Sequence, residues 1–257
     1  PRWAAKAYRK LLRAFLDRCD DIVATSPNYI QSSPVLKPVE SRCSVIPLGV
    51  DVERFSKVSP AAIAECEGIL GDLPRPRVLF VGRLVYYKGV DVLLKALAHV
   101  PGVSGIIVGD GPLKRELGEF AERLGISKRV RFLAPLPDDL YPAIYHCADF
   151  FVLPSIERTE AFGIVGLEAM AAGLPLVTTE LSTGTSYHNK DRETGFVVSP
   201  GDVKELAERL SLLAAEGTQR QGFGLSGKKR VKEHYEDVST LEAYFSFYGD
   251  TARKLPQ

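Results

Sequence analysis

The chain has 257 residues, of which 45% are hydrophobic and 25% are charged. This is the composition of an ordinary globular protein and excludes disordered, collagen-like and coiled-coil chains. With 33 Lys and Arg against 32 Asp and Glu, the net charge is +1. General attraction to nucleic acid is therefore not expected. No apolar run reaches the roughly 18 residues of a membrane span.

The first part of the chain reads as a basic helix. Residues 2–18 place apolar side chains at helical spacing, and the other faces carry six cations and one acid, Asp17. Short β-type runs follow at 22–25 and 45–46. Because no cap and no strand precede the first helix, we expect the chain to begin inside a larger protein.

From residue 77 onward, short apolar runs alternate with patterns of helical period. The runs end at glycine or proline, as buried strands do. The expected strands are 78–81, 106–108, 130–133, 150–153, 176–179 and 196–198. Strands that are apolar throughout and alternate with helices predict a parallel sheet covered on both faces. We therefore expect a doubly wound, Rossmann-like α/β fold.

Two cations follow the first of these strands. Arg83 and Lys88 lie in one loop between the strand 78–81 and the next helix. Open parallel sheets bind ligands at the carboxyl ends of their strands. A guanidinium, an ammonium and the N–H groups of a helix N-terminus together suit a diphosphate. The alternative is a pair of solvated surface cations.

A glycine turn follows the second strand. Gly109-Asp110-Gly111-Pro112 contains a G-x-G, but the third glycine of the dinucleotide-binding fingerprint is missing. This argues against a dinucleotide oxidoreductase. The turn either approaches a ligand or is a tight turn without one.

The strongest feature follows the strand 150–153. Glu160 lies in the loop, Phe162-Gly163 opens a helix, and Glu168 lies about a turn and a half inside it. A glutamate on an apolar helix needs a partner to offset its burial. The paired hydroxyls of a sugar or ribose are suitable donors. Alternatively, Glu160 caps its own helix and Glu168 pairs with a nearby cation.

No metal site is expected. The sequence has no aspartates at i and i+2 and no CxxC pair, and its four histidines form no ligand-spaced group. His188, in the loop 182–190 after a strand, is a weak site candidate. His99 and His146 are interpreted as structural helix residues.

Several of these segments together resemble one family. Glu160 and Glu168 have the E-x7-E spacing of retaining glycosyltransferases with the GT-B fold, family four, the glycosyl transferases group 1. Further segments that resemble the family are I-P-L-G-V-D at 46–51 with Phe55, G-R-L and K-G within 82–89, V-G-D-G-P at 108–112, L-E-A-M-A-A-G-L-P at 167–175 and G-F-V-V at 195–198. The resemblance begins near residue 20. Leu48 and Ala161 depart from the usual Asn and Gly.

The resemblance implies roles for individual residues. Arg83 and Lys88 would bind the donor diphosphate, Glu168 the ribose hydroxyls, and Glu160 the hydroxyls of the transferred sugar. Glu160, Arg83 and Lys88 are thus the expected catalytic residues. The other implied donor contacts are the backbone at Phe162, Gly163 and Ile164, the turns at Gly82 and Gly109, and, for the base, the loop 134–137 with Leu136.

The resemblance also implies a division of the chain. The expected parts are a remnant of the N-terminal acceptor-side domain at 1–45, an interdomain linker at 46–59, a nucleotide-sugar-binding Rossmann-like domain at 60–227 and C-terminal crossover helices at 228–257. The chain would then be the C-terminal, donor-binding half of a GT-B glycosyltransferase.

The implied activity is transfer of a sugar, with retention, from a UDP-, GDP- or ADP-linked donor to the hydroxyl of a carbohydrate or lipid-linked acceptor. It needs neither a metal nor another cofactor. We expect this chain alone to bind donor with little or no transfer. The alternatives are a nucleotide-sugar epimerase of the same architecture and a noncatalytic nucleotide-sugar binder.

The resemblance to this family also implies a cytoplasmic enzyme of polysaccharide biosynthesis. The basic helix 2–18 would suit peripheral contact with the anionic inner face of a membrane. The alternative is that its cations form a solvated face of the first domain.

Overall fold

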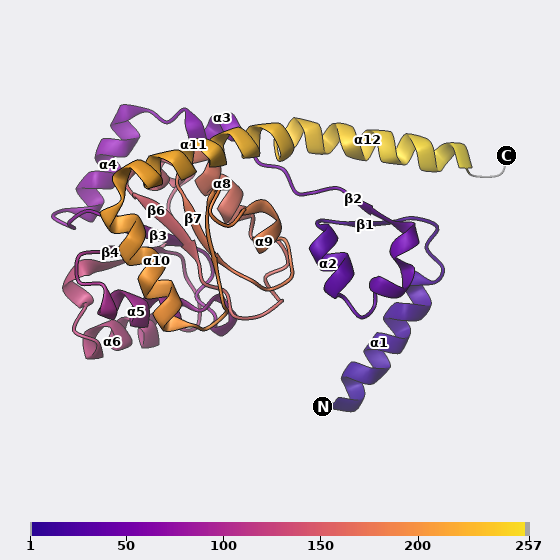
Figure 1. Cartoon of the computed structure of the whole chain (residues 1–257), viewed down its shortest axis with the longest axis horizontal. Helices are drawn as coiled ribbons and strands as arrows, with labels where there is room; N and C mark the ends of the chain where they lie inside the picture. The colour runs from indigo at the N-terminus through magenta and orange to yellow at the C-terminus, as the bar shows by residue number, and fades with distance from the viewer. Residues whose placement is uncertain (1, 255–257) are drawn as a thin grey trace.

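The computed structural model describes residues 2–254, and the side chains of residues 8 and 10–249. Figure 1 shows a large α/β unit and a small N-terminal unit, joined by an extended segment. Much of the cationic face predicted for the first helix falls on side chains outside the described ones. The small unit consists of α1 (Arg2–Leu16), β1 (Ile22–Ala24), α2 (Pro27–Ser32), the 3-10 turn η1 (Lys37–Arg42) and β2 (Cys43–Val45), with β1 and β2 parallel.

A six-stranded parallel sheet forms the centre of the large unit, in the order β5-β4-β3-β6-β7-β8. Its strands are β3 (Arg77–Val81), β4 (Ser104–Val108), β5 (Val130–Leu133), β6 (Phe150–Leu153), β7 (Leu176–Thr179) and β8 (Gly195–Val198). Every residue of β3, β4, β6 and β7 is buried. Each predicted strand is present, and the predicted doubly wound fold is confirmed.

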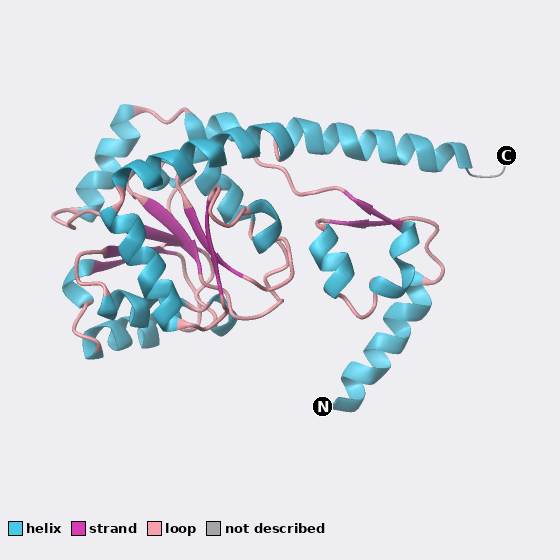
Figure 2. Ribbon diagram, in the orientation of Figure 1, coloured by secondary structure: helices cyan, strands magenta, loops and turns pink. Residues whose placement is uncertain are grey.

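Helices lie on both faces of this sheet (Figure 2). The helices and 3-10 turns are α3 (Val52–Ser56), α4 (Pro60–Leu70), η2 (Tyr86–Lys88), α5 (Val90–His99), α6 (Lys114–Arg123), η3 (Ser127–Arg129), α7 (Tyr141–His146), α8 (Ile164–Ala172), α9 (Thr185–His188), α10 (Val203–Ala215), α11 (Gly217–His234) and α12 (Asp237–Lys254). None of the described helices combines the length and the apolar character needed to cross a bilayer.

The order of the strands fixes where ligands can enter. The chain runs outward from β3 through β4 to β5, and then returns to place β6 on the other side of β3. The order of the strands therefore reverses between β3 and β6. Such a switch point leaves a crevice at this edge of the sheet.

The segment that joins the two units meets the start of α12. The Val50 N–H donates to the Tyr235 carbonyl at 2.8 Å, and the Asp237 N–H donates to the Val50 carbonyl at 3.2 Å. A Cβ on Gly49 would lie 2.6 Å from the Asp237 Cα, so only glycine fits here. From this crossing, α12 extends in the direction of the small unit (Figure 1).

Candidate active site at the carboxyl edge of the sheet

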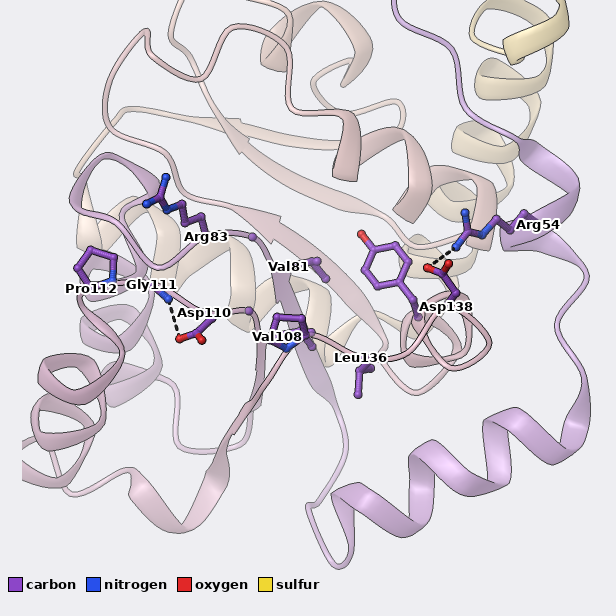
Figure 3. Close-up of a pocket in the computed structure, with 13 residues that line it drawn as sticks. Arg54, Val81, Arg83, Val108, Asp110, Gly111, Pro112, Leu136 and Asp138 are labelled. Carbon is purple, nitrogen blue, oxygen red and sulfur yellow. Dashed lines mark hydrogen bonds and ion pairs between the residues drawn. The ribbon is translucent and has the colours of Figure 1, made fainter.

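A cavity of about 950 Å³ opens at the carboxyl ends of β3, β4 and β5. It is large enough for a nucleotide-sized ligand. Its lining comes from the loops after these three strands, from α7 and from α3: Arg54, Val81, Gly82, Arg83, Val108, Gly109, Asp110, Gly111, Pro112, Pro135, Leu136, Asp138 and Tyr141 (Figure 3). Four predicted donor contacts, Gly82, Arg83, Gly109 and Leu136, thus line one cavity.

Two glycine turns approach each other closely in the wall of this cavity. Gly109 has φ +147°, and a Cβ there would lie 2.0 Å from the Gly82 carbonyl oxygen. The Leu84 N–H donates to the Asp110 carbonyl at 2.8 Å, which ties the two turns together. The G-x-G turn is therefore a tight turn that packs against the neighbouring loop and also lines the cavity.

Arg83 provides positive charge at the cavity. Its side chain is exposed, and within the described part of the chain no hydrogen bond or ion pair engages its guanidinium. Its donors are therefore available to a ligand. In Figure 3, Arg83 lies at the same end of the cavity as Gly111 and Pro112, and Arg54 and Asp138 lie at the other.

Lys88 and Glu160 form a buried ion pair. The Lys88 Nζ contacts the Glu160 Oε2, and the two side chains are 12% and 9% exposed. The Ser155 hydroxyl donates to the same Oε2 at 3.0 Å, and the Thr183 hydroxyl donates to the Glu160 carbonyl at 2.8 Å. The sequence assigned these two residues to separate parts of a ligand, whereas the structure pairs them directly.

A glycine makes this pairing possible. Gly89, which follows Lys88, has φ +66°, and a Cβ there would lie 2.1 Å from the Pro154 carbonyl oxygen. The Ile156 N–H donates to the Tyr87 carbonyl at 2.8 Å. The loops after β3 and β6 thus touch backbone to backbone, which brings Lys88 against Glu160.

Glu168 is held by tyrosines rather than by a cation. Its Oε2 accepts hydrogen bonds from the Tyr141 hydroxyl at 2.6 Å and the Tyr145 hydroxyl at 2.5 Å. Burial, reinforced by the Glu168 charge, raises the pKa of both tyrosines, so both hydroxyls keep their protons. The predicted need for a partner is met by two residues of α7 that the sequence pattern did not single out.

The His188 side chain contacts the residues at the start of α8. Phe162 is buried, and Gly163 begins the helix with φ +77°. The His188 Nε2 lies 3.0 Å from the Phe162 carbonyl oxygen, to which it donates as a neutral imidazole. Burial lowers the pKa of His188 to about 4. His188 is fully buried and lies outside the cavity lining, so the structure gives it a supporting position rather than a ligand-facing one.

Lys88, Glu160 and Glu168 are not among the residues that line the cavity, but Lys88 and Glu168 are next to lining residues, and Glu160 is paired with Lys88. Lys88 belongs to the loop that begins with Gly82, and a Cβ on Gly82 would lie 3.7 Å from the Lys88 Nζ. Glu168 is bonded to Tyr141, which lines the cavity. The structure therefore gathers cations, carboxylates and backbone N–H groups around one edge of the sheet.

Two further cavity residues had no strong signal in the sequence. Arg54 of α3 and Asp138 form an exposed ion pair with a 3.4 Å N–O distance. Arg54 follows the I-P-L-G-V-D segment, and that segment was assigned only a linking role. The apolar side of this end is formed by Pro135 and Leu136.

Comparison with known proteins identifies what the chain is similar to. The sequence profile described as glycosyl transferases group 1 matches residues 70–230. O-antigen chain mannosyltransferase C of Escherichia coli is 35% identical over 95% of this chain and 64% of its own length. A GDP-mannose-dependent alpha-(1-6)-phosphatidylinositol monomannoside mannosyltransferase of Mycobacterium tuberculosis is 33% identical over 96% of this chain and 66% of its own length.

A solved structure has the same fold. The crystal structure of HepE from Anabaena in complex with UDP-glucose superposes with a TM-score of 0.82 and 25% identity, covering 94% of this chain and 68% of that one. The present chain spans less than two thirds of the length of the two curated relatives.

Proposed function

Because the chain belongs to the glycosyl transferases group 1 family, we propose that it binds the nucleotide-sugar donor of a GT-B glycosyltransferase. The predicted family is confirmed by the profile match and the relatives. One observation carries the proposed donor site: a nucleotide-sized cavity lies at the carboxyl ends of β3, β4 and β5, with Arg83, which no described residue pairs, at one end and the tyrosine-held Glu168 beside it. The transferred sugar would lie near Lys88 and Glu160.

The diphosphate would bind at Arg83 and Lys88. No described residue engages the N–H donors of the Arg83 guanidinium. Lys88 lies in the same loop, just before the N-terminus of α5. When the sugar–phosphate bond breaks, the leaving diphosphate gains charge. Cations that hold it more tightly in the transition state lower the barrier. We propose that these two side chains supply this charge without a metal or other cofactor.

The transferred sugar would bind at Glu160. Its Oε2 is engaged by both Lys88 and Ser155, which reduces its strength as a nucleophile and supports a role in accepting sugar hydroxyls. The backbone at Phe162, Gly163 and Ile164 at the start of α8 would provide N–H donors to the same sugar. Attack by the acceptor hydroxyl from the face that the diphosphate leaves would give retention.

The base would occupy the end of the cavity formed by Leu136. Relatives named for GDP-mannose make GDP-mannose the first donor to test, and UDP-glucose, bound by the similar HepE structure, the second. By analogy with the same relatives, the acceptor would be a glycan or a lipid-linked sugar, in a step of polysaccharide assembly. We propose that this step is cytoplasmic. Contact of the basic helix with a membrane remains a prediction.

Calorimetric titration with GDP-mannose, UDP-glucose and ADP-glucose tests the proposal. We expect one nucleotide class to bind, and Arg83→Ala and Glu168→Ala each to weaken it by roughly tenfold or more, the size of a charge-assisted hydrogen bond. Absence of binding by the folded chain would overturn the proposed donor site. Release of an isomerised sugar without acceptor would instead identify an epimerase.

A further inference from the structure

We propose that Tyr141 and Tyr145 are positioning residues that fix the carboxylate of Glu168, so that Oε2 is held by the protein and Oε1 is presented to the vicinal hydroxyls of a ribose. This inference rests on the proposed function, because it assigns how the nucleotide part of the donor is held. Neither tyrosine is proposed to touch the reacting atoms.

The two oxygens of Glu168 have different surroundings. Oε2 accepts both tyrosine hydroxyls, at 2.6 and 2.5 Å. No described residue donates a hydrogen bond to Oε1. A carboxylate oxygen has two lone pairs, so Oε2 is fully used by the pair of donors. The opposite oxygen keeps its capacity to accept hydroxyl protons from a ligand.

Without these donors, the carboxylate would not have a fixed orientation. The terminal torsion of a glutamate is broad and has no strongly preferred staggered well. Two donors that converge on one oxygen select a single orientation. The ligand then finds Oε1 already in place, and binding does not incur the cost of ordering that torsion.

The tyrosines are themselves held by aromatic packing. The Phe55 ring meets Tyr141 and Tyr145 edge-on, with ring centroids 5.9 and 5.4 Å apart. Tyr145 also stacks on Phe151 at 6.0 Å and is fully buried. Phe55 lies on α3, in the segment expected to link the domains. The orientation of Glu168 is thus fixed through a cluster that includes the linker.

Tyr141 is the tyrosine of this pair that reaches the cavity. Its side chain lines the cavity, whereas Tyr145 lies behind it in the core. The cluster therefore has one side in the protein interior and one side at the cavity. A ribose that enters beside Tyr141 would meet the Glu168 Oε1 at this boundary.

The test compares a nucleotide with and without ribose hydroxyls. The probes are GDP and 2′,3′-dideoxy-GDP, with UDP and its dideoxy form as a second pair, titrated calorimetrically into the wild-type chain, Tyr141→Phe, Tyr145→Phe and Glu168→Gln. We expect the wild type to prefer the ribose form by about tenfold or more. Each tyrosine variant should lose about threefold to tenfold of affinity for GDP, with affinity for the dideoxy form unchanged within about twofold.

Tyr86→Phe is the matched control. It also removes a hydroxyl that donates to a carboxylate, that of Glu157 at 2.7 Å, but at an exposed site away from Glu168. The control should keep the full ribose preference. Circular dichroism and thermal melting establish that each variant is folded.

The outcomes distinguish a failure of the donor site from a failure of the positioning role. A wild-type chain that binds neither nucleotide would overturn the donor site and this inference with it. Nucleotide binding in which the tyrosine variants keep the wild-type ribose preference would overturn the positioning role alone. Equal losses for the ribose and dideoxy forms would also overturn it, because they would indicate general loss of structure.

Discussion

The ammonium of Lys88 and the carboxylate of Glu160, 72 residues apart in sequence, form a buried ion pair between the loops after β3 and β6. Each group was expected to contact a different part of the donor. Their pairing means that the carboxylate offsets part of the positive charge that a diphosphate would meet. In the proposed function, a sugar-linked diphosphate would therefore suit the site better than a free one, because its sugar hydroxyls would engage Glu160.

The first prediction concerns this offset charge. Glu160→Gln should raise the affinity for free GDP or UDP about tenfold, because a like charge near the diphosphate is removed. The gain should be absent for the sugar nucleotide, which loses its hydroxyl acceptor. Calorimetry with both ligands measures the two effects. Glu157→Gln, an exposed carboxylate of the same loop, is the control, and an equal gain there would contradict the prediction.

The second prediction separates the two cations. Arg83→Ala should leave the melting temperature unchanged, because Arg83 is exposed and has no ion pair in the described structure. Lys88→Ala should destabilise the fold by about 3–5 kcal/mol, because it leaves the buried Glu160 carboxylate without a countercharge. Chemical denaturation measures both. Adding Glu160→Gln to Lys88→Ala should recover much of the loss, and failure to do so would contradict the assignment.

The third prediction tests the close approach of the two loops. Gly89→Ala should destabilise the protein and weaken nucleotide binding, because its Cβ would lie 2.1 Å from the Pro154 carbonyl oxygen. Gly125→Ala is a matched control: Gly125 has φ +70° but no atom within 4 Å of the added Cβ. The control should cost only about 1 kcal/mol for its backbone conformation. Equal unfolding free energies for the two variants would refute the steric account.

The fourth prediction concerns pH. Burial lowers the pKa of His188 to about 4, below its ordinary value of 6.5. Between these values the unfolded chain binds a proton that the folded chain does not, so stability falls as the pH falls from 6.5 to 4. The fall should amount to about 3 kcal/mol. Above pH 6.5 this contribution to stability is fully present, and below pH 4 it has been lost.

His188→Gln checks this assignment. Its amide can still donate to the Phe162 carbonyl but does not titrate, so the loss of stability between pH 6.5 and 4 should shrink. Denaturation at several pH values measures the change. His234→Gln, at an exposed position, should retain the full loss. An unchanged pH dependence in the His188 variant would show that another group is responsible.

Much of the fold could be predicted from local pattern. Apolar runs bounded by glycine and proline identify all six strands, because buried parallel strands have no polar face. The helix α8 ends at Gly173, with φ +89°, as the sequence indicated. Short elements were missed: α9 was taken as a loop and α3 as part of a linker, because four or five residues are too few to show a helical period.

The candidate site was predicted less completely. Strand ends and glycines pointed to Arg83 and Gly109 as donor contacts, and both residues line the same cavity. The tyrosine partners of Glu168 could not be predicted, because the hydroxyls reach it from α7, 23 and 27 residues earlier in the chain. A tyrosine in an apolar helix resembles a core residue until its neighbour is known.

The crossing of Val50 with the start of α12 has a mechanical consequence. The segment that joins the two units meets the start of α12 at this point, and both the N–H and the carbonyl of Val50 are bonded to it. The joining segment is therefore anchored to the C-terminal helices where it enters the large unit. Phe55 lies five residues beyond this anchor and packs against Tyr141 and Tyr145. A displacement of the anchor would therefore reach the aromatic cluster around Glu168 before it reached the loop that carries Arg83.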